Sequence, residues 1–266
     1  MKTELKVLFL GDMVGRIGRK TVQKFLEKNK ANYDFIIANV ENASHGFGLT
    51  LKNHDELASY GINCMTSGNH IWDKKDIFEY IDNSNYLVRP LNYGKSVRGV
   101  GYRIFNDKFL VINLLGKTFM PHVECPFKAL QALSEEVSFD DKITIIDFHA
   151  EATAEKECMG YFAQSLGAKA VFGTHTHVQT ADEKILSETC AYITDAGFTG
   201  GTGGVIGMDY EISLKRILTS IPERFDVVES KESILCGVEV VFDNKTNNPT
   251  NIARVFEKYK DEDNED

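Results

Sequence analysis

The sequence predicts a single α/β domain in which helices cover a β-sheet. Short apolar runs alternate with helix-like stretches from one end of the chain to the other, which is the pattern of α/β sandwiches. The 266 residues are 42% hydrophobic, which is enough for a sizeable core. Because the chain shows no internal repeat, no Pro- or Ser-rich linker and no break in composition, we expect one domain over residues 1–259.

Strands are expected where short runs rich in Ile, Val or Phe end at a glycine or a polar cluster. Runs of about four to eight such residues are typical of buried strands. The first of them is followed directly by Gly11 and Asp12. The six candidates are Val7–Leu10, Phe35–Val40, Phe109–Leu114, Ile143–Phe148, Ala168–Phe172 and Cys190–Thr194.

Helices are expected between these strands, where apolar residues recur at helical spacing. In the first of them Val22, Phe25 and Leu26 lie at positions i, i+3 and i+4, and the second ends at Gly61, a typical residue after a helix C-terminus. The six candidates are Arg19–Lys28, Lys52–Tyr60, Asp76–Ile81, Pro126–Val137, Thr153–Leu166 and Tyr210–Ser220.

The C-terminal part of the chain predicts an antiparallel pair of strands. Ile234–Phe242 and Ile252–Phe256 are apolar runs that flank a turn at Asn244–Asn248. Residues 260–266 are nearly all charged or polar, so we expect an acidic, solvated and disordered tail there.

The composition excludes several classes of protein. A formal charge of -9 argues against binding of long nucleic acid, which requires an excess of Lys and Arg. No apolar run approaches the length of a membrane helix, which is about 20 residues. Five scattered cysteines without a CxxC pair fit reduced thiols. We therefore expect a cytoplasmic protein without membrane partners. The sequence leaves open whether the protein forms a homo-oligomer.

Asp, Glu, Asn and His side chains follow the carboxyl ends of the strand candidates. Ligands of open α/β sheets bind at that edge. Each segment taken alone has an ordinary structural interpretation, such as a helix cap or a turn. Five segments with the same chemistry at the same edge favour a common site instead. They contribute Asp12, Glu41 with Asn42, Asn69 with His70, Asp147 with His149, and His175 with His177.

The residue types at these strand ends indicate a metal site. Carboxylates, imidazoles and amide oxygens without thiolates suit Mn, Fe or Zn. His175 and His177 lie two residues apart, so both imidazoles point to one side of an extended segment. One catalytic ion takes about three ligands from a protein, and the six or seven candidates here exceed that number. They favour two ions about 3.5–4 Å apart, an arrangement that serves phosphate ester hydrolysis.

These residues, in this order, resemble the calcineurin-like metallophosphoesterase superfamily. Finer motifs resemble the YmdB family of bacterial 2′,3′-cyclic-nucleotide phosphodiesterases over nearly the whole chain. The motifs are Gly11-Asp12-Met13-Val14-Gly15, Glu41-Asn42-Ala43, His45-Gly46, Gly68-Asn69-His70-Ile71-Trp72-Asp73-Lys74-Lys75, Leu87-Val88-Arg89-Pro90, Asp147-Phe148-His149-Ala150-Glu151-Ala152-Thr153 and 173–182 with Gly173-Thr174-His175-Thr176-His177.

The resemblance implies a four-layer α/β/β/α sandwich with a dinuclear iron or manganese centre, zinc being an alternative. The chain departs from the superfamily where Val14 replaces the imidazole of the usual Asp-x-His and where Glu41 replaces a bridging Asp. The implied ligands are Asp12, Asn42 and His177 for the first ion, Asn69, His149 and His175 for the second, and Glu41 between them.

The resulting hypothesis is hydrolysis of 2′,3′-cyclic nucleotides. A hydroxide held between the two ions would attack phosphorus, and His70 would protonate the leaving 2′ oxygen, giving a 3′-nucleotide. Two alternatives are a phosphomonoesterase or protein phosphatase with the same metals, and an RNA-associated regulatory protein with residual activity.

Further residues are assigned on weaker grounds. Asp73 and Glu151 are predicted to orient ligand imidazoles. Trp72 is interpreted as a packing anchor rather than a base-stacking residue, and the Gly-rich segment 197–207 as a rim of the pocket. Contacts to substrate phosphate are predicted for Asn113, Lys117 and Arg89.

Overall fold

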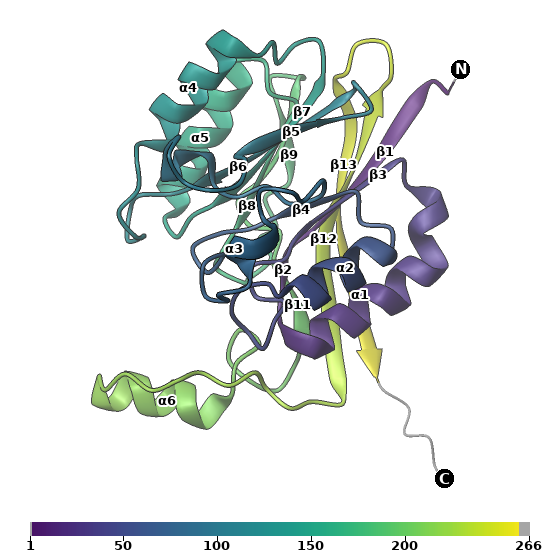
Figure 1. The fold of residues 1–266 in the computed structure, drawn as a ribbon. Helices are drawn as coiled ribbons and strands as arrows, with labels where there is room; N and C mark the ends of the chain where they lie inside the picture. Colours follow the sequence, from purple (N-terminus) through teal and green to yellow (C-terminus); the bar gives the residue numbers. More distant parts are fainter. Residues whose placement is uncertain (1, 261–266) are drawn as a thin grey trace.

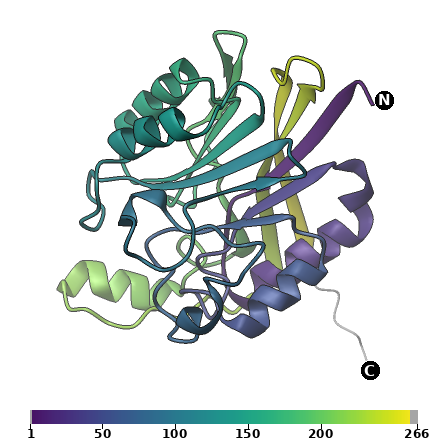
Figure 2. The same ribbon diagram turned by 45° about the horizontal axis from the view of Figure 1, so that its top comes forward.

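Two β-sheets pack face to face and carry helices on their outer faces in the computed structural model, which describes residues 2–260 (Figures 1 and 2). The layers follow one another as helices, sheet, sheet and helices. The prediction of a four-layer α/β/β/α sandwich is therefore confirmed.

The first sheet has seven strands in the order β2-β11-β12-β1-β3-β4, with β13 paired to β12. Strand β3 is parallel to both β1 and β4, so the carboxyl ends of these three strands meet at one edge. The strands are β1 (Glu4–Leu10), β2 (Asp12–Met13), β3 (Phe35–Asn39), β4 (Cys64–Thr66), β11 (Phe198–Gly201), β12 (Glu232–Asp243) and β13 (Pro249–Lys260).

The second sheet has six strands in the order β5-β6-β7-β8-β10-β9. Its four central strands, β6, β7, β8 and β10, are parallel, and the two edge strands are antiparallel to their neighbours. The strands are β5 (Tyr102–Phe105), β6 (Phe109–Leu115), β7 (Ile143–His149), β8 (Ala170–Thr174), β9 (Lys184–Leu186) and β10 (Cys190–Ile193).

Helices α1, α2 and α3 cover the first sheet, whereas α4 and α5 cover the second. Helix α6 projects from the sandwich next to the loops at one end of it (Figure 1). The α-helices are α1 (Gly15–Asn29), α2 (Leu51–Ser59), α3 (Ile77–Tyr80), α4 (Pro126–Glu136), α5 (Thr153–Ser165) and α6 (Tyr210–Thr219), and short 3₁₀ turns occupy Lys30–Asn32 and Leu91–Tyr93.

The layer between the sheets is apolar and fully buried, which fixes the sheets against each other. Phe9 of β1 contacts Phe172 of β8 with ring centroids 4.8 Å apart, and Phe35 of β3 stacks on Phe109 of β6 at 4.3 Å. Truncation of such a ring to alanine costs about 3–5 kcal/mol. The inter-sheet packing therefore sets where the strand ends of one sheet lie relative to those of the other.

The expected elements are present with shifted ends. The predicted C-terminal pair is confirmed as the antiparallel strands β12 and β13, which are longer than expected. Strand β8 begins two residues later than predicted, and β11 lies inside the segment 197–207 that the sequence analysis treated as a rim. Residues 261–266 of the predicted tail lie outside the described part of the chain, and Lys260 is the last residue of β13. Over residues 2–260, every helix is too short or too polar to cross a membrane.

Candidate metal centre

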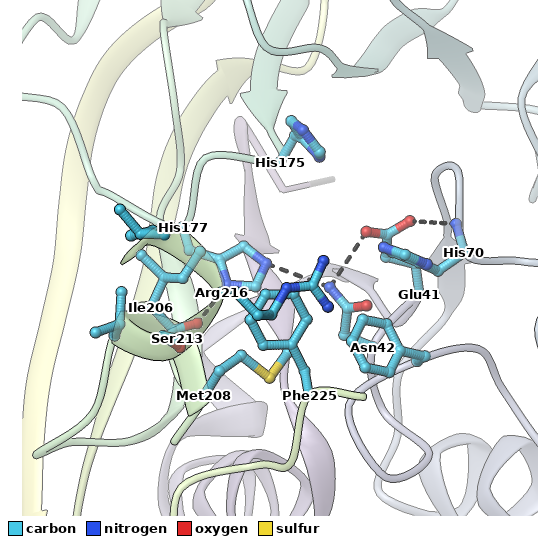
Figure 3. Close-up of a pocket in the computed structure, with 13 residues that line it drawn as sticks. Glu41, Asn42, His70, His175, His177, Ile206, Met208, Ser213, Arg216 and Phe225 are labelled. Carbon is cyan, nitrogen blue, oxygen red and sulfur yellow. Dashed lines mark hydrogen bonds between the residues drawn. The ribbon is translucent and has the colours of Figure 1, made fainter. Parts of the chain in front are cut away.

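The structure brings all seven predicted metal ligands to one place, at the edge where parallel strands of both sheets end. The ligands come from segments that follow β1, β3 and β4 in the first sheet and from the ends of β7 and β8 in the second. Figure 3 shows several of them around one cavity. The seven are Asp12, Glu41, Asn42, Asn69, His149, His175 and His177.

Four of these side chains converge on one point. Nε2 of His149 lies 3.2 Å from Oδ1 of Asn69, 3.1 Å from Oε1 of Glu41 and 3.1 Å from Nδ1 of His175. Two ligand atoms that bind one ion at about 2.1 Å, with an angle of 90–110° between them, lie about 3.0–3.4 Å apart. Each of these three distances is the one expected between two ligands of one cation, and the ligand atoms of Glu41, His149 and His175 all lie within 4.8 Å of one another.

The other ring nitrogens of the two histidines are held by the protein, so Nε2 of His149 and Nδ1 of His175 are the nitrogens that face the shared point. The Thr174 hydroxyl donates to Oδ1 of Asp147 at 2.7 Å, so it accepts the Nδ1–H of His149 at 2.9 Å. Nε2 of His175 lies 3.2 Å from a carboxylate oxygen of Glu151. Partners of this kind fix the tautomer of metal-binding histidines. The predicted contact of Glu151 with a ligand imidazole is thus present.

The remaining three ligands form a second group beside the first. Asp12 is fully buried and its Oδ2 accepts the backbone N–H of His175, whereas Oδ1 has no hydrogen-bond partner in the described structure. Oδ1 of Asn42 is orphaned as well. Nδ1 of His177 donates to the carbonyl of Ile206 at 2.8 Å, and this leaves Nε2 for a metal. An orphaned buried acceptor is costly, and a bound cation would satisfy Oδ1 of Asp12.

The amide of Asn42 fits a ligand in one of its two orientations. Its Nδ2 lies 3.2 Å from both Oε1 of Glu41 and Nε2 of His177. The two amide atoms differ little in shape, so a half-turn of the amide places Oδ1 at that point. The oxygen of Asn42 would then face the same space as Glu41 and His177.

The buried ionisable groups of the centre shift one another's pKa values. Burial raises the pKa of Asp12. Burial opposes ionisation of Glu41 too, but His149 and the backbone N–H of His70 outweigh it and hold the pKa of Glu41 well below its usual range. For His149, burial alone would lower the pKa, yet Glu41 and Asp12 raise it to about 9. Burial and the adjacent His149 lower the pKa of His175 to about 3, so this imidazole is neutral and ready to bind a metal.

Gly68 leaves the space in which these ligands meet. A Cβ atom at this position would lie 2.3 Å from Oε2 of Glu41 and 2.4 Å from Nε2 of His149. No real Cβ atom approaches a polar atom so closely, so any larger residue would displace the Glu41 carboxylate or the His149 imidazole. The glycine in the Gly68-Asn69-His70 motif is therefore explained by its close approach to Glu41 and His149.

A buried ion pair supports the loop that carries two of the histidines. Nζ of Lys156 lies 2.7 Å from Oδ2 of Asp195, and both side chains are about 1% exposed. The same oxygen accepts the backbone N–H and the hydroxyl of Thr176, which stands between His175 and His177. Asp195 therefore fixes the backbone of the His-x-His segment through its hydrogen bonds to Thr176.

His70 lies at the mouth of the centre and lines the cavity beside the ligands. Its backbone N–H donates to Oε2 of Glu41 at 3.0 Å, and its Nδ1 lies 2.9 Å from Asp73. The edge of the imidazole also packs against the ring of Phe47, with centroids 4.8 Å apart. Asp73 thus orients His70, through Nδ1, rather than a predicted metal ligand.

The structure does not bring the three predicted phosphate contacts to the lining of this cavity. The Arg89 guanidinium is buried and donates to five backbone carbonyls of residues 90–98. The Asn113 amide bonds the backbone of Ser67 and Asp147. Lys117 is exposed in the loop after β6. Trp72 stacks on Phe78 against the core, in agreement with its interpretation as a packing anchor.

The cavity, with a volume of about 450 Å³ that is within the range of small-molecule sites, has a second wall. Val205 and Ile206 of this wall lie in the segment 197–207 that the sequence predicts as a rim of the pocket, whereas its other residues were not predicted. This wall comes from the segment around α6, whose sequence carries no recognisable motif. A slight signal was the run of apolar residues within the Gly-rich segment. The lining residues of the wall are Val205, Ile206, Met208, Ser213, Arg216, Ile217 and Phe225.

Comparison with known proteins identifies the family. A model of the family described as "YmdB-like protein" matches residues 8–255. The chain belongs to the YmdB-like family. A Bacillus subtilis (strain 168) relative named "2′,3′-cyclic-nucleotide 2′-phosphodiesterase" is 45% identical over 257 residues, which is 95% of this chain and 97% of the relative.

Other relatives and solved structures also match most of the chain. A Mycoplasma pneumoniae protein named "Putative phosphatase/phosphodiesterase" is 39% identical over 90% of this chain and 86% of its own. A hypothetical protein from Thermus thermophilus has a TM-score of 0.89 at 34% identity, covering 96% of this chain and 99% of that one. A structure described as a novel phosphatase from Mycoplasma pneumoniae also has a TM-score of 0.89, at 36% identity, covering 98% and 96%. The YmdB-like assignment thus extends over the whole sandwich, including the strand ends that form the centre.

Proposed function

We propose that this protein is a dinuclear metal phosphodiesterase that hydrolyses 2′,3′-cyclic nucleotides at the 2′ bond. The observation that supports it is the convergence of seven ligand-type side chains beside an imidazole, His70, that lines the same cavity. Relatives named as phosphodiesterases make the chain an enzyme of that class. The ions of this proposal are divalent, Fe or Mn, with Zn as an alternative.

The ligand residues divide into two groups that share one carboxylate. Glu41 would be the ligand that the two ions share, because its Oε1 lies 3.1 Å from Nε2 of His149 in one group and 3.2 Å from the amide of Asn42 in the other. When bound, the ions would supply an activated water and neutralise charge that develops on the phosphate oxygens. The chain itself holds the ligands in place through Thr174, Glu151 and the Ile206 carbonyl.

His70 is the proton donor of this proposal. Asp73 holds Nδ1, so Nε2 is the nitrogen that gives its proton to the 2′ oxygen as the bond to phosphorus breaks. The backbone N–H of His70 binds Glu41, so the donor is held at a fixed place relative to the bridging carboxylate. The product of this cleavage is a 3′-nucleotide.

The test combines elemental analysis of the purified protein with turnover of 2′,3′-cyclic AMP before and after chelation. We expect two ions per chain, 3′-AMP as the product, and activity that chelation removes and Mn²⁺ restores. Asp12→Asn should lose metal and activity, whereas Asp107→Asn, whose side chain is 97% exposed, should keep both. A metal-free protein with chelator-insensitive turnover, or 2′-AMP as the product, would contradict the proposal. Preferential turnover of 3′-AMP or a phosphopeptide would favour the phosphatase alternative.

A further inference from the structure

A segment outside the sandwich closes the cavity opposite the metal ligands. Residues 202–231, which we call the α6 arm, run between β11 and β12 and contain α6. Ser213 is the buried residue of α6, and the helix adds little to the core of the sandwich. The arm nevertheless supplies half of the cavity lining. The base of the arm is held by packing, since Met208, Phe225 and Val227 belong to a hydrophobic cluster with Val14 and Phe198 of the sandwich, whereas α6 itself adds mainly to the cavity lining.

The arm presents a cation stacked on an aromatic ring. The guanidinium of Arg216 lies over the ring of Phe225, 3.9 Å from its centroid. Figure 3 shows both side chains grouped with Met208 in the lower half of the view, below His175. Nη1 of Arg216 donates to the carbonyl of Glu223, which uses one of the five N–H donors of a guanidinium. The other donors and the open face of the group are available to a ligand.

We propose that this wall binds the nucleobase of the substrate, an inference that rests on the proposed function. A base is flat, apolar on its faces and polar at its edge. The lining of Phe47, Met208 and Phe225 offers apolar and aromatic surface, and the Arg216 guanidinium offers donors to base nitrogens and oxygens. Among the described residues that line the cavity, Arg216 carries the one permanent positive charge.

The wall is connected to both catalytic elements of the centre. The ring of Phe47 contacts His70 on one side and lies 6.3 Å from the ring of Phe225 on the other. Ile206 carries the carbonyl that holds His177 and adopts a φ of 50°, a conformation that β-branched residues rarely take. A base in this cavity would therefore lie next to the proton donor, and the arm could not shift without disturbing a metal ligand.

The experiment compares 2′,3′-cyclic AMP with methyl riboside 2′,3′-cyclic phosphate, which lacks the base. Phe225→Leu keeps apolar bulk without the aromatic face, and Arg216→Met keeps the aliphatic stem without the charge. Phe225→Leu should lower kcat/KM for cyclic AMP about 5- to 150-fold, the range for loss of one base–aromatic contact. Arg216→Met should lower it about 10- to 150-fold, the range for loss of one hydrogen bond to a charged group. Each should change kcat/KM for the baseless substrate less than about twofold. Leu218→Ala is the matched control, because Leu218 lies on α6 but is 74% exposed and outside the cavity lining.

Equal losses on both substrates, or no loss on either, would overturn the inference. A second readout separates it from the proposed function: binding of adenosine to the metal-free wild type, measured by calorimetry. If the wild type hydrolyses neither substrate, the proposed function fails, but adenosine binding that Phe225→Leu weakens still supports a base site. If adenosine binds wild type and Phe225→Leu equally, the base site is wrong whatever the enzyme hydrolyses.

Discussion

Replacement of Asp195 by asparagine would test whether the His-x-His segment depends on the buried ion pair beneath it. Asp195 and Lys156 are both about 1% exposed and joined by a 2.7 Å contact. Asp195→Asn keeps the size of the side chain and removes its charge. The Lys156 ammonium would then be buried without a counter-charge, and the amide would set an N–H group against either Thr176 or Gly197, whose N–H groups the carboxylate accepts.

The expected effect is large because both partners are fully desolvated. Removal of one member of a buried ion pair costs about 3–5 kcal/mol of unfolding free energy. For a chain of this size that corresponds to a fall in Tm of about 6–20 °C. Loss of a residue that orients metal ligands from behind typically lowers metal affinity about 10- to 100-fold. We expect both effects, since Thr176 lies between His175 and His177.

The assays are thermal and urea unfolding of the metal-free protein and titration with Mn²⁺. The informative partner is the double variant Lys156→Met with Asp195→Asn, which removes the unpaired charge and should recover most of the lost stability. It should not recover the metal affinity, because the loop support is still altered. A single Asp195→Asn variant within about 1 kcal/mol of wild type, or a double variant with wild-type metal affinity, would refute this reasoning.

Three further outcomes are expected. His70→Ala should retain both ions by elemental analysis yet lose about 10²- to 10⁴-fold in turnover of 2′,3′-cyclic AMP, and turnover equal to wild type would remove His70 from the role of acid. Gly68→Ala should bind less metal per chain, because its Cβ would meet Glu41 and His149, and a full metal complement would contradict that contact. Mn²⁺ at about 100 times its Kd should stabilise the wild type by about 2.7 kcal/mol, measured as a rise in Tm that chelator reverses, and no rise would speak against a built site.

Much of the fold could be predicted because buried strands and amphipathic helices leave strong local patterns. Runs such as Ile143–Phe148 are apolar throughout most of their length, and the structure buries β7 completely. The short strands β2 and β11 gave no such pattern. Asp12–Met13 of β2 pairs with Phe198–Thr199 across much of the sequence, so their strand character depends on long-range pairing rather than on local propensity.

The candidate site likewise combines residues that the local sequence indicates with residues whose role depends on long-range contacts. The convergence of the predicted ligands could be expected because each lies at or after the carboxyl end of a strand, and the parallel pairing of strands brings those ends together. Lys156 and Asp195, 39 residues apart, look like an ordinary helix lysine and an ordinary loop aspartate in the sequence. Arg89 shows the converse, since an arginine near a family motif indicated phosphate binding, yet its donors are taken by backbone carbonyls.

Under the proposed function, the position of the centre between two sheets explains how an acidic protein with a charge of -9 would attract a phosphate. Asp12, Glu41 and Asn42 come from the first sheet, and His149, His175 and His177 come from the second. The carboxylates of one sheet are thus brought against the imidazoles of the other, and the neutral His175 adds no charge of its own. Two divalent ions would bring four positive charges against the two carboxylates of the ligand set, so the filled centre would be cationic although the surface is not.

This charge reversal requires both sheets to be docked, because Phe9, Phe35 and their partners hold the two halves of the centre at ligand distance. Loosening that inter-sheet layer should therefore release metal before it unfolds either sheet.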